Sequence, residues 1–298
     1  MSTATVEPIG AVRRLRRRDL PELLQQIHDP PRALFLRGDA DAAILSSPAV
    51  AIVGARACSP YGSQVARMLG RELAASGLVV VSGLARGVDG EAHRGAVDAG
   101  GVTVAVLGCG IDRDYPAAHA ELARRICERG LVVSEYEPGV EPAPWRFPAR
   151  NRIIAGLAAV TVIVEARERS GALITADFSL EGGRDVFAVP GEITSSLATG
   201  TNRLLRQGAA PLTSAEDVLE LFGLAACQRQ RAPEIGATAA RVLDRLADGA
   251  ASADELVRAT DLEPGPLAAG LAELELAGLV AEAEGRYRAV VRAGWSGR

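Results

Sequence analysis

Residues 50–56 read Val-Ala-Ile-Val-Gly-Ala-Arg, an unbroken apolar run that ends in glycine and arginine. A short apolar run bounded by glycine predicts a buried strand. Five more such runs occur before residue 223, and helix-patterned segments separate them. The expected strands are 50–53, 78–81, 102–107, 131–133, 160–164 and 186–189, and the expected helices are 62–75, 90–99, 117–129, 150–157 and 173–180. Unbroken strands that alternate with helices predict an α/β fold with a doubly wound, mainly parallel sheet.

Nearly every expected strand runs into glycine, and arginines lie in or beside several of these turns. The carboxyl ends of parallel strands meet along one edge of the sheet, where doubly wound folds bind their ligands. Glycine lets the backbone approach a phosphate closely, and the exposed N–H groups bind it. The turn residues that we expect to bind an anion are Gly54, Arg56, Ser82, Gly83, Arg86, Gly87, Ser170, Gly171 and Thr175.

Residues 147–157, Phe-Pro-Ala-Arg-Asn-Arg-Ile-Ile-Ala-Gly-Leu, place two arginines directly before apolar residues with helical spacing. We therefore expect Arg150 and Arg152 at a helix N-terminus, where backbone N–H and guanidinium groups together favour phosphate. Aromatic residues make up only 4% of the chain, yet Trp145 and Phe147 both lie beside this arginine cluster. We expect them to stack on nucleic-acid bases.

The composition is typical of a soluble globular protein, with 48% hydrophobic and 23% charged residues among 298. No apolar run reaches the roughly 18 residues that span a bilayer. The arginine-rich start also lacks the apolar segment of a secretory signal. We expect a cytoplasmic protein that does not contact a membrane.

The chain contains no lysine, so all 33 basic residues are arginine. This excludes a lysine nucleophile and the usual lysine-containing phosphate loop. Three scattered histidines and four single cysteines give no metal-binding spacing and no disulfide framework. We therefore expect no catalytic residue, no metal and no cofactor. Because the net charge is −4, a nucleic-acid site must be a local patch.

The glycine turns do not form a dinucleotide fingerprint. The sequence Gly108-Cys109-Gly110 has Arg113 where the third glycine belongs. Acidic residues also lie near the strand ends, and we expect them to pair with neighbouring arginines rather than to bind a metal or act as acid and base. These residues are Asp89, Asp112, Asp114, Glu135 and Glu165.

The pattern divides the chain into four parts. Residues 1–48 form an N-terminal extension that packs on the core. Its basic run, residues 13–18, could contact phosphates, but we favour a disordered or solvated terminus. Residues 49–223 form the α/β domain and 224–235 a linker. Residues 236–298 show three helix patterns and two short strands, 279–281 and 287–291, which predict a winged helix.

The charge of this tail argues against a DNA-reading role. Residues 231–298 contain eight arginines and eleven acidic residues, and the expected recognition helix carries acids but no arginine. A winged helix that reads a major groove needs a basic face. We therefore favour a protein contact or a regulatory role for this domain.

Six ordered motifs between residues 20 and 223 strongly resemble the DNA processing protein A family, also called DprA or Smf. They are Gly54-Ala55-Arg56 with Tyr61-Gly62, Ser82-Gly83-Leu84-Ala85-Arg86-Gly87-Val88-Asp89, Gly108-Cys109-Gly110-Ile111-Asp112 with Tyr115-Pro116, Phe147 with Arg150-Asn151-Arg152-Ile153-Ile154-Ala155-Gly156, Ser170-Gly171-Ala172-Leu173-Ile174-Thr175-Ala176, and Val186-Phe187-Ala188-Val189-Pro190-Gly191.

The resemblance implies an extended Rossmann-like domain that binds single-stranded DNA, forms a homodimer and hands the strand to the RecA recombinase during natural transformation. It also implies a C-terminal winged helix. By the same match, Arg56 and the residues from Phe147 to Arg152, including Asn151, would lie in the DNA pocket.

Three functions remain open from the sequence. The leading hypothesis is a non-catalytic single-strand binder. The alternative is a Rossmann-like enzyme that binds or hydrolyses nucleotides, although Pro190-Gly191-Glu192 only begins the glycine-rich loop expected of nucleotide-hydrolysing relatives. A third possibility is a scaffold whose winged helix is the main interaction site.

Overall fold

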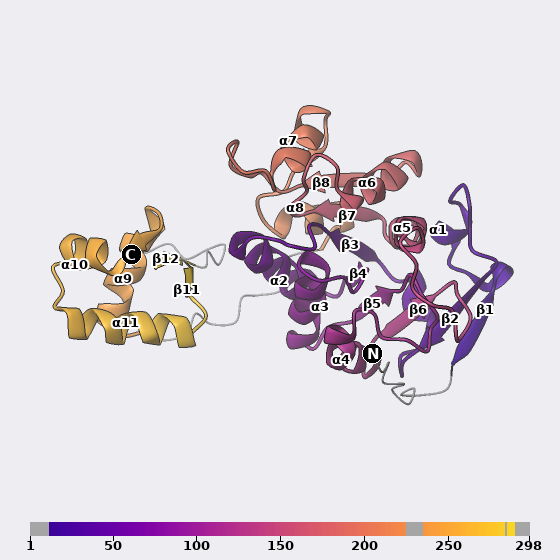
Figure 1. The fold of residues 1–298 in the computed structure, drawn as a ribbon, viewed down its shortest axis with the longest axis horizontal. Helices are drawn as coiled ribbons and strands as arrows, with labels where there is room; N and C mark the ends of the chain where they lie inside the picture. Colours follow the sequence, from indigo (N-terminus) through magenta and orange to yellow (C-terminus); the bar gives the residue numbers. More distant parts are fainter. Residues whose placement is uncertain (1–11, 225–234, 284, 290–298) are drawn as a thin grey trace. The chain divides into compact units, whose positions relative to one another are not determined.

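The computed structural model describes residues 12–224, 235–283 and 285–289. Contacts divide the chain into two compact units, residues 1–227 and residues 228–298 (Figure 1). The expected linker lies almost wholly outside the described residues, as do residues 290–291 of the last expected strand.

In the described part of the chain, the first unit contains one nine-stranded sheet with the order β1-β2-β6-β5-β4-β3-β7-β8-β9. The strands are β1 (Arg13–Arg16), β2 (Ala33–Arg37), β3 (Ala49–Val53), β4 (Val79–Ser82), β5 (Thr103–Val106), β6 (Leu131–Ser134), β7 (Val160–Ile163), β8 (Asp185–Ala188) and β9 (Ala210–Pro211). All neighbours from β6 to β9 are parallel, whereas β2 is antiparallel to both β6 and β1. The strand order reverses at β3, between β4 and β7. This confirms the extended Rossmann-like, doubly wound fold.

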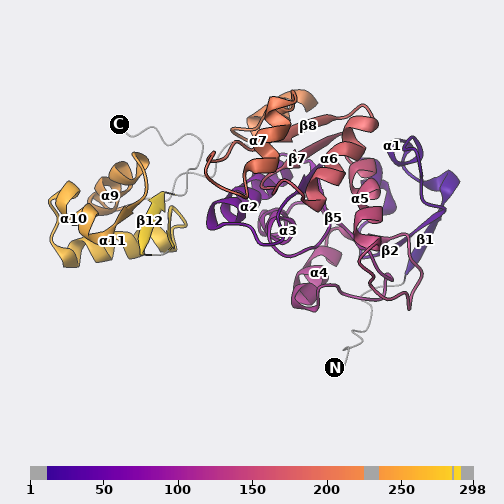
Figure 2. The same ribbon diagram turned by 45° about the horizontal axis from the view of Figure 1, so that its top comes forward.

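Helices cover both faces of this sheet (Figure 2). They are α1 (Glu22–Gln25), α2 (Pro60–Ala75), α3 (Val88–Asp98), α4 (Ala120–Cys127), α5 (Arg146–Leu157), α6 (Gly171–Glu181), α7 (Thr199–Arg206) and α8 (Glu216–Leu219). The side chains of α1, α5, α6 and α7 share one apolar core with the sheet, and those of α2, α3 and α8 share another on the opposite face. None of the helices in the described ranges is long and apolar enough to cross a membrane.

The N-terminal arginine run is not a solvated terminus, so that expectation is wrong. Residues Arg13–Arg16 form the edge strand β1, in which half-buried and exposed residues alternate. Arg13 donates to the carbonyls of Gly38 and Ala40, at 2.9 and 2.6 Å. The guanidinium of Arg14 lies 5.6 Å from the ring centre of Phe35. The aliphatic part of an arginine side chain can pack on apolar surface, and its guanidinium can stack on an aromatic ring. A sequence pattern that treats arginine only as a charge does not predict this packing.

The helix expected at residues 150–157 begins earlier, at Arg146. Pro148 lies in its first turn, where the missing N–H has no intrahelical partner to lose. Arg150 and Arg152, which we expected at the N-terminus because they precede the apolar run, therefore lie in the second turn. The sequence pattern also missed α7, α8, β1 and β9, because short elements between glycine-rich turns carry little periodicity.

The second unit is a winged helix. It comprises α9 (Ala237–Ala247), β10 (Ala251–Ser252), α10 (Ala253–Thr260), α11 (Pro264–Leu276), β11 (Val280–Ala283) and β12 (Arg286–Ala289), with β12 central in a three-stranded sheet. The start of α10 is fixed by a capping box in which Ser252 and Glu255 each bind the other's backbone N–H. The expected three helices and hairpin are confirmed, and β10 is an addition.

Buried His93 on α3 predicts that acid destabilises the fold. Its Nδ1 donates to Thr103 Oγ1 at 2.7 Å, because the Thr103 hydroxyl donates to the Val80 carbonyl. Burial lowers the pKa of His93 to about 3, whereas the unfolded imidazole titrates near about 6.5. Between these values only the unfolded chain binds the proton. The free energy of unfolding should therefore fall as pH drops below about 6.5, by about 2 kcal/mol at about pH 5 from this residue alone.

Urea denaturation of the wild type and of His93→Gln at neutral pH and at about pH 5 checks this expectation. The variant lacks the titrating ring, so it should lose less stability on acidification than the wild type. An equal loss in both proteins would show that His93 is not the residue that responds.

Candidate functional site

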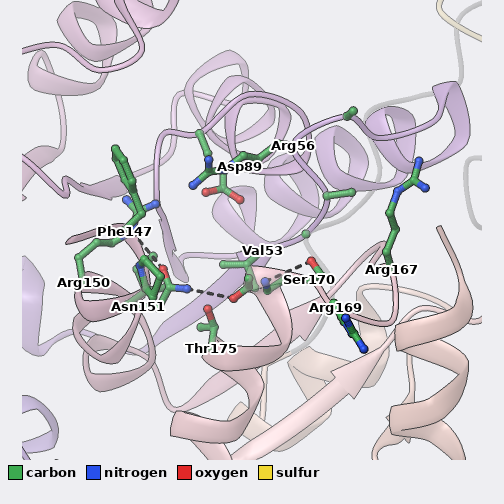
Figure 3. A pocket seen from close by; sticks show the side chains of 18 residues that line it. Val53, Arg56, Asp89, Phe147, Arg150, Asn151, Arg167, Arg169, Ser170 and Thr175 are labelled. Atoms are coloured by element: carbon green, nitrogen blue, oxygen red, sulfur yellow. Dashed lines mark hydrogen bonds between the residues drawn. The ribbon is translucent and has the colours of Figure 1, made fainter. Parts of the chain in front are cut away.

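A pocket of about 350 Å³ lies at the carboxyl edge of the sheet, where the strand order reverses at β3 and β7 (Figure 3). Its walls come from the β3–α2 turn, the first turns of α5, the β7–α6 loop and the start of α6. The structure brings together eight of the residues that the sequence singled out: Gly54, Arg56, Phe147, Arg150, Asn151, Ser170, Gly171 and Thr175.

One wall of the pocket is the N-terminus of α6. Ser170 caps this helix by accepting the N–H of Ala172 at 3.3 Å. The hydroxyl of Thr175 is buried in the pocket wall and has no hydrogen-bond partner among the described residues. A helix N-terminus attracts anions through its free N–H groups and its dipole. This wall is therefore suited to a phosphate group.

Arg167 and Arg169, in the loop before α6, also line the pocket. Both are exposed, and neither forms an ion pair with a described residue. Figure 3 shows them on the side of the pocket opposite Phe147 and Arg150. The predicted site residues did not include this pair. The signal that could have found it is position, since both arginines directly follow a strand end and precede a helix.

Phe147 lies between Tyr115 and Arg56. The Tyr115 and Phe147 rings are stacked with their centres 5.2 Å apart, and the Arg56 guanidinium lies 5.2 Å from the Phe147 ring centre. Arg56 is exposed and makes no ion pair with a described residue. A planar cation held over an aromatic ring keeps its N–H donors available at the ring edge. Arg56 is thus oriented without being neutralised.

Arg150 is buried inside the protein rather than presented to the pocket opening, with 4% of its surface exposed. Its Nη1 donates to the carbonyls of Gly83, at 2.6 Å, and Val106, and its Nε donates to Asn151 Oδ1 at 3.1 Å. Burial lowers its pKa to about 10, so it stays charged at neutral pH. It joins the ends of β4 and β5 to α5. Burial likewise raises the pKa of Asp89, which accepts the Gly83 N–H at 3.1 Å.

Gly83 separates the two buried charges. A Cβ at this position would lie 2.4 Å from Arg150 Nη2 and 2.6 Å from Asp89 Oδ2, so only glycine fits. Asn151 continues the connection by donating to the Gly171 carbonyl at 3.0 Å, at the start of α6. Arg150 and Asn151 therefore position the pocket walls relative to one another.

Six predicted site residues lie outside the pocket lining. Arg152 is held by Glu135 through two contacts of 2.7 Å and by Asp29 at 3.0 Å. Ser82 is buried and donates to the Ile52 carbonyl at 2.6 Å. Gly83 is also buried and lies next to Arg150 and Asp89. Gly87 has a φ of +73° and packs on the Ala55 carbonyl, where a Cβ would not fit. Arg86 is exposed, as is Trp145, at 63%.

The acidic residues take several partners. Asp114 pairs with buried Arg37, and Glu135 pairs with Arg152, as expected. Asp112 instead accepts the Gly139 N–H. The Glu165 carboxylate accepts the Ser59 N–H at 2.9 Å and its hydroxyl at 2.5 Å, directly at the start of α2. A nucleotide pyrophosphate would lie at this helix in a dinucleotide-binding fold, so an internal anion occupies that place.

Comparison with known proteins agrees with this architecture. The family model described as DNA recombination-mediator protein A matches residues 12–223, and the model described as DprA winged helix domain matches residues 225–286. The DNA processing protein DprA of Streptococcus pneumoniae is 47% identical over 199 residues, which are 67% of this chain and 70% of that protein. Protein Smf of Escherichia coli is 38% identical over 284 residues, 92% of this chain and 75% of that protein.

Two solved structures share the fold of the first unit. DNA processing protein A from Streptococcus pneumoniae has a TM-score of 0.67 and 43% identity, and the match covers 71% of this chain and 75% of that one. DNA processing protein A from Helicobacter pylori, whose structure concerns its single-stranded DNA binding mode, has a TM-score of 0.64 and 32% identity over 71% of this chain and 95% of that one. With both domains matched in order, the chain belongs to the DNA recombination-mediator protein A family.

Proposed function

We propose that this protein binds single-stranded DNA in the pocket without catalysing a reaction on it. One observation carries the proposal: Arg56, Arg167, Arg169, the α6 N-terminus and the Phe147 ring all line one pocket, and Arg56 lies against the ring. Guanidinium and backbone N–H groups match phosphates, and an aromatic ring beside them accepts a base without reading its sequence. The Helicobacter pylori relative, which binds single-stranded DNA, supports this assignment.

The remaining parts of the proposal concern what happens to the bound strand. As a cytoplasmic homodimer, the protein protects incoming DNA and loads the RecA recombinase on it during natural transformation. We propose that residues 49–223 hold the strand. The winged helix, which lies in the acidic part of the chain, contacts protein rather than duplex DNA. Membership of the DNA recombination-mediator family supports a role in recombination.

Fluorescence anisotropy with a labelled single-stranded oligonucleotide of about 20 nucleotides tests the DNA-binding step. Affinity should fall steeply as salt is raised, because each neutralised phosphate releases counterions. Unlabelled single strand should compete well, and duplex and mononucleotide poorly. The result would instead indicate a nucleotide-binding protein if the affinity did not change with salt concentration. Displacement of the labelled strand by a mononucleotide at the same concentration of nucleotides would indicate the same.

A further inference from the structure

We propose that the bound strand leaves the pocket along the carboxyl edge of the sheet and reaches a second phosphate-binding surface, formed by Arg16, Arg17 and Arg32. We call these three residues the N-terminal arginine surface. The inference rests on the proposed function and adds a site of the same chemical class, the phosphates of single-stranded DNA, at a place distant from the pocket.

Strand direction places this surface on the same edge as the pocket. Because β1 is antiparallel to β2 and β2 is antiparallel to β6, β1 runs in the direction of β6 and the other parallel strands. Arg16 is the last residue of β1 and is paired with Ala33, directly after Arg32. The Arg17 N–H donates to the Arg32 carbonyl at 3.1 Å. All three arginines therefore lie where the parallel strands end.

The three arginines are available to a ligand. Each is exposed, and none forms an ion pair with another residue in the described ranges. Their charge contrasts with the net charge of −4 of the chain. Arg13 and Arg14, earlier on the same strand, are engaged with carbonyls and with an aromatic ring. Arg13 and Arg14 thus contribute to folding, whereas Arg16, Arg17 and Arg32 have no ion-pair partner among the described residues.

An aromatic platform lies between the pocket and this surface. The Arg146 guanidinium lies 4.8 Å from the Trp145 ring centre and 5.1 Å from that of Tyr136, which follows β6. Trp145 is 63% exposed, the most exposed aromatic residue described. Stacked aromatic and guanidinium planes bind unpaired bases of any sequence. The pocket, the platform and the arginines therefore all lie along the carboxyl edge of the sheet.

Three carboxylates near this path are paired with arginines, whereas exposed Glu137, directly after Tyr136, forms no ion pair with a described residue. Glu135 and Asp29 both bind Arg152, and Glu141 forms an ion pair with Arg113 at 2.7 Å. Arg152 is therefore engaged by two carboxylates and is not itself a phosphate ligand. Its one positive charge offsets part of their repulsion toward a strand.

The length of the path sets the kind of ligand that can use it. Five strand spacings separate β3 from β1 in the sheet order, which corresponds to about 24 Å. A mononucleotide or a very short oligonucleotide fills the pocket without reaching the arginines. A longer strand reaches both, so the N-terminal arginine surface should add affinity only above a threshold length.

The test compares full-length wild type with the triple variant Arg16→Ala, Arg17→Ala, Arg32→Ala, using labelled strands of about 4 and about 20 nucleotides. The triple variant should bind the longer strand at least about 10-fold more weakly and lower the salt slope by about 2 for three lost phosphate contacts. Binding of the shorter strand should not change. The matched control Arg71→Ala, Arg129→Ala, Arg206→Ala removes three other exposed arginines and should behave as wild type.

The outcomes separate this inference from the function on which it rests. If wild type binds the longer strand and the triple variant binds it equally well with the same salt slope, the N-terminal arginine surface is not a DNA site. The proposal that the pocket binds DNA would be unaffected. Equal weakening of both strand lengths also overturns the inference. If wild type binds neither strand, the proposed function itself fails. A protein partner in place of DNA would appear as unchanged strand binding in the triple variant.

A second measurement does not depend on any variant. Photocrosslinking of wild type to the longer strand, with a photoreactive base near either end, should label a peptide within residues 16–32 from one end. If the photoreactive base labelled only pocket residues, whichever end of the strand carried it, the proposed path would be overturned.

Discussion

Replacing Arg150 with methionine should lower the free energy of unfolding by about 3–5 kcal/mol, the usual result of removing one member of a buried charge arrangement. The variant would leave the carbonyls of Gly83 and Val106 without their shared donor. It would also leave Asp89 buried without Arg150, the cation that most lowers its pKa, and burial already raises the pKa of that carboxyl. Urea denaturation at neutral pH measures the loss.

The double variant Arg150→Met, Asp89→Asn is the informative control, since it removes both buried charges. It should recover part of the stability, because the asparagine need not be ionised in the low-dielectric interior. Arg71→Ala, a change at an exposed arginine of α2, should cost about 0.5 kcal/mol or less. If Arg150→Met retained full stability and lost only DNA affinity, Arg150 would be a DNA ligand, and its structural role would be refuted.

Replacing Arg56 with alanine should weaken single-strand binding by about 10- to 100-fold, equivalent to about 1.4–2.7 kcal/mol, while stability stays within about 0.5 kcal/mol. Arg56 is exposed, has no ion pair among the described residues and is held against Phe147. Its N–H groups therefore lose little conformational entropy when they bind a phosphate. Anisotropy titrations of wild type and variant at one fixed salt concentration measure the change.

Two further substitutions sharpen the result. Arg56→Lys keeps the charge but loses the planar fork, so it should recover only part of the affinity. Arg71→Ala should bind as wild type. If Arg56→Ala bound DNA normally while Arg71→Ala did not, the pocket would not be the binding site.

The sheet and the edge that carries the site could be predicted from the sequence, because buried parallel strands read as continuous apolar runs and their glycine turns follow at once. The six expected strands all occur within a few residues of the predicted bounds. The second unit was predictable for a similar reason, since α9 and α10 have regular apolar spacing.

The roles of individual arginines could not be predicted in the same way. Arg150 and Arg152 are two residues apart on one helix, yet one is buried against backbone carbonyls and the other is held by Glu135. Their partners come from turns that lie far away in the sequence. Arg167 follows a predicted strand, yet nothing in the sequence shows that it lines the pocket. Arg17 belongs to a charged run that carries no sign of its position at the edge of the sheet. Only the packing of the chain separates an arginine that supports a wall from one that faces a ligand.

The Glu165 carboxylate at the start of α2 has a consequence for how the protein behaves among cellular metabolites. A tethered anion has a local concentration that dilution does not reduce, so a free nucleotide would have to displace a competitor that never diffuses away. We therefore expect the α2 half of the switch point to bind free nucleotides weakly. Only the α6 half stays open, which favours a polymeric ligand that can gather further contacts beyond it.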